Sequence, residues 1–325
     1  MIPELIFVTP GIGTSSTVSQ LDHAAHPSHA DFKEIFLASL HIDPPIVQAI
    51  RRLLDARPVR GIHFGRCTGQ VHHVLGAACA RGVEKVSFLC DFRRMESSWC
   101  QALGRCLRFG KIKKLVLQTH LTNELAKAMY KGLSNNNHHT SMLSSSSSQH
   151  HDTTLTELSV AVSHATWQSI VLLSATLPNC TSLKKLSLNR HDLLYEMEES
   201  KLSTLLKSLA NHPSLTELCI QGSSCPPGGI HVIAEHLIGS NNGLEKLDLS
   251  NHRFGMDRLE GMSCLSKALS TNASLKFLSL AGHELNEEDI HGLCRALNST
   301  STRIQELCLN DCQITNAGVS IIAQS

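Results

Sequence analysis

A short apolar pattern recurs along this chain and constrains what the chain can fold into. Apolar residues occupy positions 1, 4 and 6 of a six-residue segment, as in Leu244, Leu247 and Leu249. An early copy begins at Phe32, and further copies recur at intervals of 24 to 43 residues. Self-similarity at such a period is the signature of a solenoid. The later copies begin at Val59, Val83, Ile112, Leu155, Leu183, Leu215, Leu244, Leu275 and Ile304.

Each apolar triplet predicts a short strand, because positions 4 and 6 of an extended segment point to the same side. The segments between triplets have helical spacing, for example at Ile290, Leu293 and Leu297. Parallel strands lie about 4.8 Å apart whereas packed helices need about 8–10 Å, so an array of such units must bend. The sequence therefore predicts an α/β solenoid, a horseshoe with a parallel β-sheet on its concave face and α-helices on its convex face.

Two segments, LKFLSLAGHELNEEDIHGLCRAL at 275–297 and IQELCLNDCQITNAG at 304–318, resemble leucine-rich repeats of the ribonuclease-inhibitor type. The resemblance covers residues 32–325, about nine or ten repeats. It weakens before residue 110, where Gly61, His63 and Arg66 interrupt the pattern. It implies the horseshoe fold and a role in protein binding. We expect residues 1–31 to form a poorly defined leader that precedes this repeat domain.

A polar segment, SNNNHHTSMLSSSSSQHHD at 134–152, separates two repeats and accounts for the longest interval, 43 residues. A segment of this composition cannot join an apolar core, so it is predicted to be a flexible surface loop. The alternative is a regulated or metal-contacting loop. That loop would use the Ser144–Ser148 run or the histidines His138, His139, His150 and His151.

The residue eight positions after each triplet start occupies the slot that holds Asn or Cys in the repeats that this chain resembles. We expect these side chains to cap the turn where each strand ends, by bonding to free backbone groups. The alternative for His252, His283 and Cys312 is a metal site, but equivalent slots point in parallel whereas tetrahedral zinc needs converging ligands. Turn capping is therefore the prediction. The slots hold Cys67, Asp91, His120, Ser163, His191, Ser223, His252, His283 and Cys312.

Side chains at positions 3 and 5 of each strand are expected on the solvent-facing side of the sheet. From Lys114 to Lys246 the charge at position 3 alternates from strand to strand, which predicts ion pairs along the sheet, contact with a partner, or both. Phe277 is the one aromatic side chain that the pattern places there, which predicts a broad, polar surface of modest affinity. The candidate protein-binding residues are Lys114, Glu157, Lys185, Glu217, Lys246, Asp248, Phe277 and Glu306.

Charge and cysteine content indicate which partners, and which cellular compartment, are expected for this chain. The chain has 29 Lys and Arg residues against 28 Asp and Glu residues, so neither nucleic acid nor an anionic membrane is expected as a partner. No segment approaches the ~18 apolar residues of a membrane span, and the first residues lack the basic start of a signal peptide. The 12 cysteines include no CxxC pair. We therefore expect reduced thiols and a location in the cytosol or the nucleus.

The chain has no HExxH, GxSxG or Walker motif, so catalytic residues, metals and cofactors are not expected. The leading hypothesis is a non-enzymatic protein–protein interaction scaffold whose partner is another protein. One alternative is a GTPase-activating protein of the Ran type, although neither the acidic tail nor a strand-end arginine motif of that family is recognisable. The other alternative is the sensor portion of a larger receptor or ubiquitin-ligase subunit.

The last repeat begins at Ile304 and its helix starts at Asn316. Val319, Ile321 and Ile322 of this helix have no later repeat to cover them. Because an uncapped repeat leaves a sheet edge and apolar side chains in water, we expect one of two things. Either further residues continue the array, or this end associates with another chain.

Overall fold

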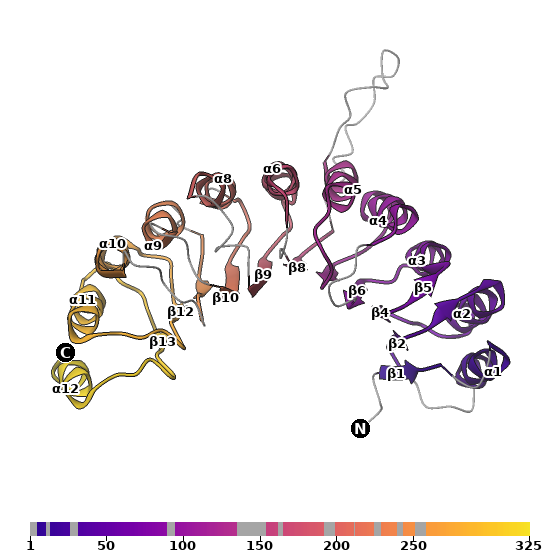
Figure 1. The fold of residues 1–325 in the computed structure, drawn as a ribbon, viewed down its shortest axis with the longest axis horizontal. Coiled ribbons are helices and arrows are strands. Elements are labelled where there is room, and N and C mark those ends of the chain that lie inside the picture. The colour runs from indigo at the N-terminus through magenta and orange to yellow at the C-terminus, as the bar shows by residue number, and fades with distance from the viewer. Residues whose placement is uncertain are drawn as a thin grey trace, which may run out of the picture. The chain divides into compact units, whose positions relative to one another are not determined.

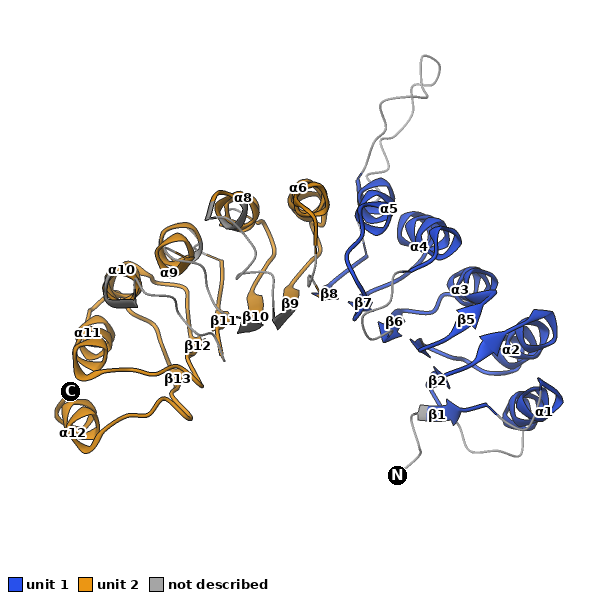
Figure 2. Ribbon diagram, in the orientation of Figure 1, with its two compact units in different colours: residues 1–160 blue, residues 161–325 orange. Residues whose placement is uncertain are grey.

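The computed structural model describes residues 5–10, 14–26, 32–89, 95–134, 154–161, 165–191, 199–210, 212–223, 229–238, 243–250 and 258–325. The chain divides into two compact units, residues 1–160 and 161–325 (Figure 2). Within each unit, strands lie along one side and helices along the other (Figure 1). This arrangement of repeated strand–helix units confirms the predicted fold class, an α/β leucine-rich repeat solenoid.

Unit 1 contains parallel strands in the order β1-β2-β4-β6-β7-β8, and β3 and β5 form a separate short parallel pair. The last residue of β8, Ala161, is the first residue of unit 2. The strands are β1 Leu5–Val8, β2 Glu34–Ala38, β3 His41–Ile42, β4 Gly61–Gly65, β5 Thr68–Gly69, β6 Lys85–Leu89, β7 Lys114–Leu117 and β8 Glu157–Ala161. The helices are α1 Thr14–Ala25, α2 Pro44–Ala56, α3 Val71–Ala80, α4 Ser97–Phe109 and α5 Asn123–Leu133.

Unit 2 contains parallel strands in the order β9-β10-β11-β12-β13. These strands are β9 Lys185–His191, β10 Glu217–Ser223, β11 Lys246–Asp248, β12 Phe277–Ser279 and β13 Glu306–Cys308. The helical segments are α6 Trp167–Thr176, η1 Leu177–Asn179, α8 Glu199–Ala210, α9 Gly229–Ile233, η2 Ala234–Ile238, α10 Arg258–Thr271, α11 Glu287–Leu297 and α12 Asn316–Gln324.

The core lies between the strands and the helices, as the apolar triplets require. Strand registers align equivalent positions, so that Leu247 lies beside Leu278, and Leu278 beside Leu307. Leu247 and Leu278 are buried, as is the position 6 residue Leu280. Burying one such side chain contributes about 1.5–3 kcal/mol, so the sum over the repeats fixes the register of the array.

Short polar side chains start several helices. The Asp43 carboxylate accepts a hydrogen bond from the Ile46 N–H at 3.1 Å, ahead of α2. Thr122 does the same for the Leu125 N–H at the start of α5. Asn286 and Asp289 bond reciprocally at the start of α11. Each such cap satisfies an N–H group that the first turn leaves unpaired, and so places the helix relative to its strand.

The N-terminal segment differs from the expected leader. β1 pairs in parallel with β2, aligning Leu5 with Glu34 and Val8 with Leu37, and α1 follows it. The expectation of nine or ten repeats therefore missed one, because the register with β2 places Pro3, and not an aliphatic or aromatic residue, at position 1 of this triplet. The division of the chain at residue 31 stays a prediction. The predicted loop at 134–152 lies outside the described residues except for Ser134.

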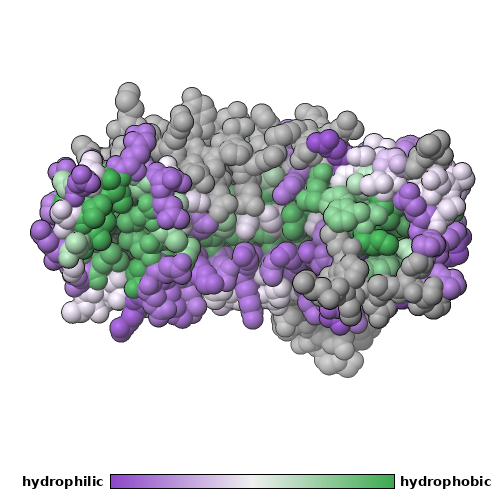
Figure 3. Space-filling view, turned by 90° about the horizontal axis from the view of Figure 1, so that it is seen from below, coloured by the Kyte–Doolittle hydropathy of each residue, from purple (hydrophilic) through white to green (hydrophobic). Residues whose placement is uncertain are grey.

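The end of unit 2 formed by β13 and α12 presents apolar surface, visible in Figure 3. Val319 is 55% exposed and Ile322 is 41% exposed, whereas the equivalent side chains of α11, Ile290 and Leu293, are buried. The expected exposure of these two side chains is confirmed. Among the described helices, none combines the length and apolar character that a bilayer-spanning helix requires.

Candidate protein-binding face of the sheet

The open face is the face of each unit's sheet that lies opposite the helices, and it carries the side chains at positions 3, 5 and 7 of the strands. The registers align these positions: Lys114 lies beside Glu157 in unit 1, and Glu217 lies between Lys185 and Lys246 in unit 2. The apolar positions 4 and 6 point the other way and are buried. The open face is thus the part of each sheet where side chains are available to another molecule.

In unit 1 a charged cluster spans three strands. The Lys85 Nζ donates to both carboxylate oxygens of Glu34, at 3.0 and 2.9 Å, although β4 lies between their strands. Gly61 of β4 makes this possible, because a Cβ added there would lie only 2.9 Å from the Glu34 Cγ. His63 of the same strand donates from its Nε2 to the Glu34 Oε2 at 2.8 Å. Glu34, His63 and Lys85 therefore form one unit across β2, β4 and β6.

The cluster holds its groups in defined protonation states. Burial raises the pKa of the Glu34 carboxyl, but the hydrogen bonds from Lys85 and His63 outweigh burial and bring the pKa below its ordinary value. Burial lowers the pKa of His63, and the bond to Glu34 offsets this only in part. At neutral pH the Glu34 carboxylate is therefore ionised and accepts a hydrogen bond from the neutral His63 imidazole.

Unit 1 also carries aromatic rings on its open face that the sequence interpretation missed. The Phe7 and Phe36 ring centroids are 5.2 Å apart, and Phe36 stacks on His63 at 5.9 Å. A Cβ at Gly65 would lie 2.9 Å from the Phe36 ring, so this second glycine of β4 leaves room for it. Phe7 remains 62% exposed. The expectation that Phe277 is the one aromatic residue on this face was therefore wrong.

The predicted charge ladder forms within each unit. Lys114 and Glu157 are 2.5 Å apart, and Glu217 lies 3.2 Å from Lys185 and 3.3 Å from Lys246. Burial raises the pKa of Glu217, and the hydrogen bonds from both lysines lower it to a net value below its ordinary one. Because the side chains are about half exposed, each pair contributes at most about 1 kcal/mol. The ladder relieves like-charge repulsion more than it stabilises the fold.

The remaining predicted residues occupy the open face of unit 2 without gathering into one cluster. Phe277 lies in register between Lys246 and Glu306. The Asp248 Oδ1 accepts from the Ser250 N–H at 3.0 Å, so this carboxylate supports its own turn. Burial, with the nearby Asp248 charge, raises the pKa of Cys219 to about 11, which keeps it a thiol. These groups present polar surface rather than reactive chemistry.

Three of the predicted turn residues bond to backbone as expected. Cys67 donates from its Sγ to the Leu37 carbonyl at 3.2 Å, and Cys312 to the Leu280 carbonyl at 3.1 Å. His283 bonds from its Nε2 to the Leu249 carbonyl at 2.6 Å. In each case the acceptor belongs to the preceding repeat, so the residue ties neighbouring repeats together. Asp91, Ser163 and His252 lie outside the described residues.

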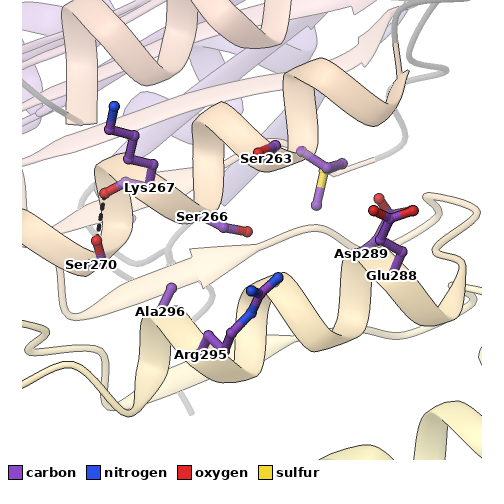
Figure 4. Close-up of a pocket in the computed structure, with 10 residues that line it drawn as sticks. Ser263, Ser266, Lys267, Ser270, Glu288, Asp289, Arg295 and Ala296 are labelled. Carbon is purple, nitrogen blue, oxygen red and sulfur yellow. Dashed lines mark hydrogen bonds between the residues drawn. The ribbon is translucent and has the colours of Figure 1, made fainter.

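A groove between α10 and α11 offers polar groups on the helix side of unit 2 (Figure 4). The Ser270 Oγ donates to the Lys267 carbonyl at 2.7 Å, and the Arg295 Nε donates to the His291 carbonyl at 3.3 Å. Asp289 belongs to the cap of α11. These bonds serve the helices themselves. No serine of α10 bonds to a carboxylate of α11 in the described structure, so the groove contains no activated nucleophile.

Comparison with known proteins supports the repeat interpretation. No family model matches the chain. Over 119 residues it is 29% identical to the ribonuclease inhibitor of Sus scrofa, which covers 37% of this chain and 25% of that protein. Over 148 residues it is 31% identical to NACHT, LRR and PYD domains-containing protein 5 of Bos taurus, which covers 45% of this chain and 13% of that protein.

Among solved structures, one similar chain comes from a TLR13–ssRNA13 complex, with 13% identity and a TM-score of 0.40. That match covers 86% of this chain and 33% of the other. The matched part of the present chain spans a quarter or less of the two curated relatives.

The strand–helix repeats and the curated relatives together define the class: the chain is a leucine-rich repeat protein. More particularly, its repeats are of the ribonuclease-inhibitor-like type, as the sequence resemblance indicated.

Proposed function

We propose that the protein is a non-enzymatic scaffold that binds another protein through the open face of its sheet. The observation that supports this most is the aligned row of solvent-facing side chains along the parallel strands, which no described helix covers. Within each unit a surface built in this way is extended, as the binding surfaces of repeat proteins are. Lys114, Glu157, Lys185 and Glu217 would contribute to it, as would the residues in the next two strands, Lys246, Asp248, Phe277 and Glu306.

Because the charged residues on this face already pair with each other, most of the affinity for a partner protein would come from other residues. Lysines and glutamates that already pair with each other gain little when a partner arrives, because the partner must compete with an existing ion pair. Aromatic rings lose no such bond when they are covered. Phe7 and Phe36 in unit 1 and Phe277 in unit 2 are therefore the proposed anchors, with the ion pairs setting specificity around them.

A second candidate function is the sensor portion of a larger receptor. It is favoured by the relatives named NACHT, LRR and PYD domains-containing proteins, which match 35–54% of this chain at 26–31% identity. Under this proposal the leucine-rich repeats would recognise the ligand and other domains would respond to it. Activation of a Ran-type GTPase stays a further alternative, which a turnover assay with small GTPases would test.

The test of the scaffold proposal is proximity labelling in the native cell, followed by pull-down of each labelled protein with purified variants. Phe277→Ala with Lys246→Glu should reduce capture of a partner that uses unit 2, and Phe36→Ala one that uses unit 1. Val171→Ala with Lys207→Glu is the matched control, since both exposed residues lie on helices of unit 2. Capture that survives both open-face variants, and fails in the control, would contradict the proposal.

Association through the C-terminal repeat is a separate proposal, supported by the exposure of Val319 and Ile322. Burying these side chains and the edge of β13 against another chain would remove apolar surface from water. Light scattering should then show concentration-dependent association of the protein. Ile321→Lys with Ile322→Lys should abolish it, and a strictly monomeric wild type would contradict the proposal.

A further inference from the structure

Four cations gather around one groove on the helix side of unit 1. The groove has a volume of about 470 Å³ and lies between α4 and α5, which are neighbours in Figure 1. Arg105 and Arg108 line it from α4, and Lys127 and Lys131 line it from α5. These residues are spaced three or four positions apart along their helices, so the charges of each pair fall on one helix face. The groove is thus bordered by two short basic rows.

Small residues bring the two helices close and form the groove floor. A Cβ at Gly104 would lie 2.8 Å from the Ala128 carbonyl oxygen, and one at Gly132 would lie 2.6 Å from the Gly104 carbonyl oxygen. The backbones of α4 and α5 therefore approach closely at these two glycines, where there is no room for a longer side chain. Gly104, Ala128 and Cys100 line the groove, and the long basic side chains border it. The groove therefore has small, uncharged residues where the two helices meet and long basic side chains around them.

The four cations lack the carboxylate partners that lysines on the open face have. Lys85, Lys114 and Lys185 each form an ion pair with a glutamate. Within the described residues, no ion pair involves Arg105, Arg108, Lys127 or Lys131. Glu124 is the one carboxylate among the lining residues. The groove therefore has an excess of positive charge in a protein whose total charge is nearly balanced.

An exposed ring lies at one end of the groove. Phe109 is 78% exposed, and the Arg108 guanidinium carbon lies 5.3 Å from its ring centroid. This cation–π contact holds the guanidinium beside the ring rather than away from it. A ligand that contacts this end would meet an apolar surface and a positive charge together. Aromatic residues, phenylalanine among them, and arginine are enriched at protein–protein interfaces.

We propose that the α4–α5 groove binds an acidic segment of another protein that carries an apolar side chain among its carboxylates. Charge complementarity selects the acidic residues, and Phe109 with the uncharged floor selects the apolar one. A phosphate backbone would satisfy the cations but would leave the floor uncovered. α4 is about 20 Å long, so about six extended residues would fill the groove. This site is distinct from the open face and does not depend on the function proposed for it.

The test uses the full chain and labelled peptides of about ten residues, drawn from a library with fixed glutamates and variable apolar positions. A second library with glutamine in place of glutamate controls for charge. Fluorescence anisotropy should show binding of the acidic library alone, weakened by salt because the contacts are partly exposed. Lys127→Glu with Lys131→Glu should weaken binding by about tenfold or more, since two attractions become repulsions. Phe109→Ala should weaken only those peptides that carry an apolar residue.

Lys207→Glu with Lys267→Glu is the matched control, because both lysines are exposed on helices of unit 2 and the change in net charge is identical. Circular dichroism of each variant verifies folding. Equal loss in the control would overturn the proposal, as would failure of every acidic peptide to bind. Tighter binding of a single-stranded oligonucleotide or of phosphatidylserine vesicles, unaffected by Phe109→Ala, would also overturn it.

Discussion

The open faces of the two units have the same strand register but different interactions. In unit 2 the ion pairs of the open face join adjacent strands, as Lys185 and Lys246 do with Glu217. In unit 1 Glu34 reaches past β4 to Lys85, and His63 is 7% exposed beneath this pair. Gly61 accounts for the difference, because it is the position 3 residue without a side chain. A glycine at position 3 thus replaces ion pairs between adjacent strands with one group of side chains that interact across three strands.

This difference predicts unequal contributions to stability. The unit 2 ladder is half exposed, so solvent and salt weaken each pair. In the unit 1 cluster, the buried His63 Nε2 donates its hydrogen bond to the Glu34 carboxylate. Losing that acceptor would leave a buried polar group unsatisfied, which costs more than losing an exposed ion pair. Substitutions on the open face of unit 1 should therefore lower the free energy of unfolding more than equivalent substitutions on the open face of unit 2.

Gly61→Val should produce the largest effect. Its side chain would occupy the space of the Glu34 Cγ, 2.9 Å from the position of the new Cβ, and would separate Glu34 from both partners. We expect a loss of about 2 kcal/mol in the free energy of unfolding, measured by urea denaturation. Lys185→Val is the control, because it puts the same strand-favouring residue at position 3 of β9. It should cost about 0.5 kcal/mol or less, and equal losses would contradict the role of Gly61.

His63→Gln should change how stability depends on pH. The pKa of His63 lies below the ordinary 6.5, so the unfolded chain takes up a proton that the folded chain excludes as pH falls below that value. Stability is therefore fully present above pH 6.5 and is lost on acidification through the window beneath it. The pKa of Glu34 is also lowered, so its stabilising effect fades only at lower pH, below the ordinary value of 4.5.

The measurement is the urea midpoint of wild type and His63→Gln at pH 7.5 and 5.5. Wild type should lose more stability than the variant over this interval, by about 1 kcal/mol or less. His72 and His212 also have lowered pKa values, but they are present in both proteins and their effects cancel in the comparison. An identical pH dependence would show that His63 is not coupled to folding.

The sequence predicts the parts of this fold that repeat, because burial forces apolar residues into positions 4 and 6 of every strand. It also predicts the Lys114–Glu157 and Lys185–Glu217 pairs, since those follow from register alone. It does not predict β1, whose four residues acquire a register only by pairing with β2. Neither does it predict the Glu34–Lys85 contact, which depends on the space above Gly61. Two of the residues that weakened the repeat pattern, Gly61 and His63, build the cluster.

The smallest expected effect is the coupling energy of a single ion pair, and comparing this energy between the open faces of units 1 and 2 tests their difference directly. A double-mutant cycle with Lys185→Met and Glu217→Gln should give a coupling of a few tenths of a kcal/mol, because Glu217 keeps Lys246 as a partner and solvent screens the pair. The matched cycle with Lys85→Met and Glu34→Gln should give about 1 kcal/mol or more, since His63 shares the same carboxylate. Raising the salt concentration should reduce the first coupling toward zero and leave most of the second. Equal couplings with equal salt dependence would mean that the glycine alters only the geometry of the open face and not its energetics.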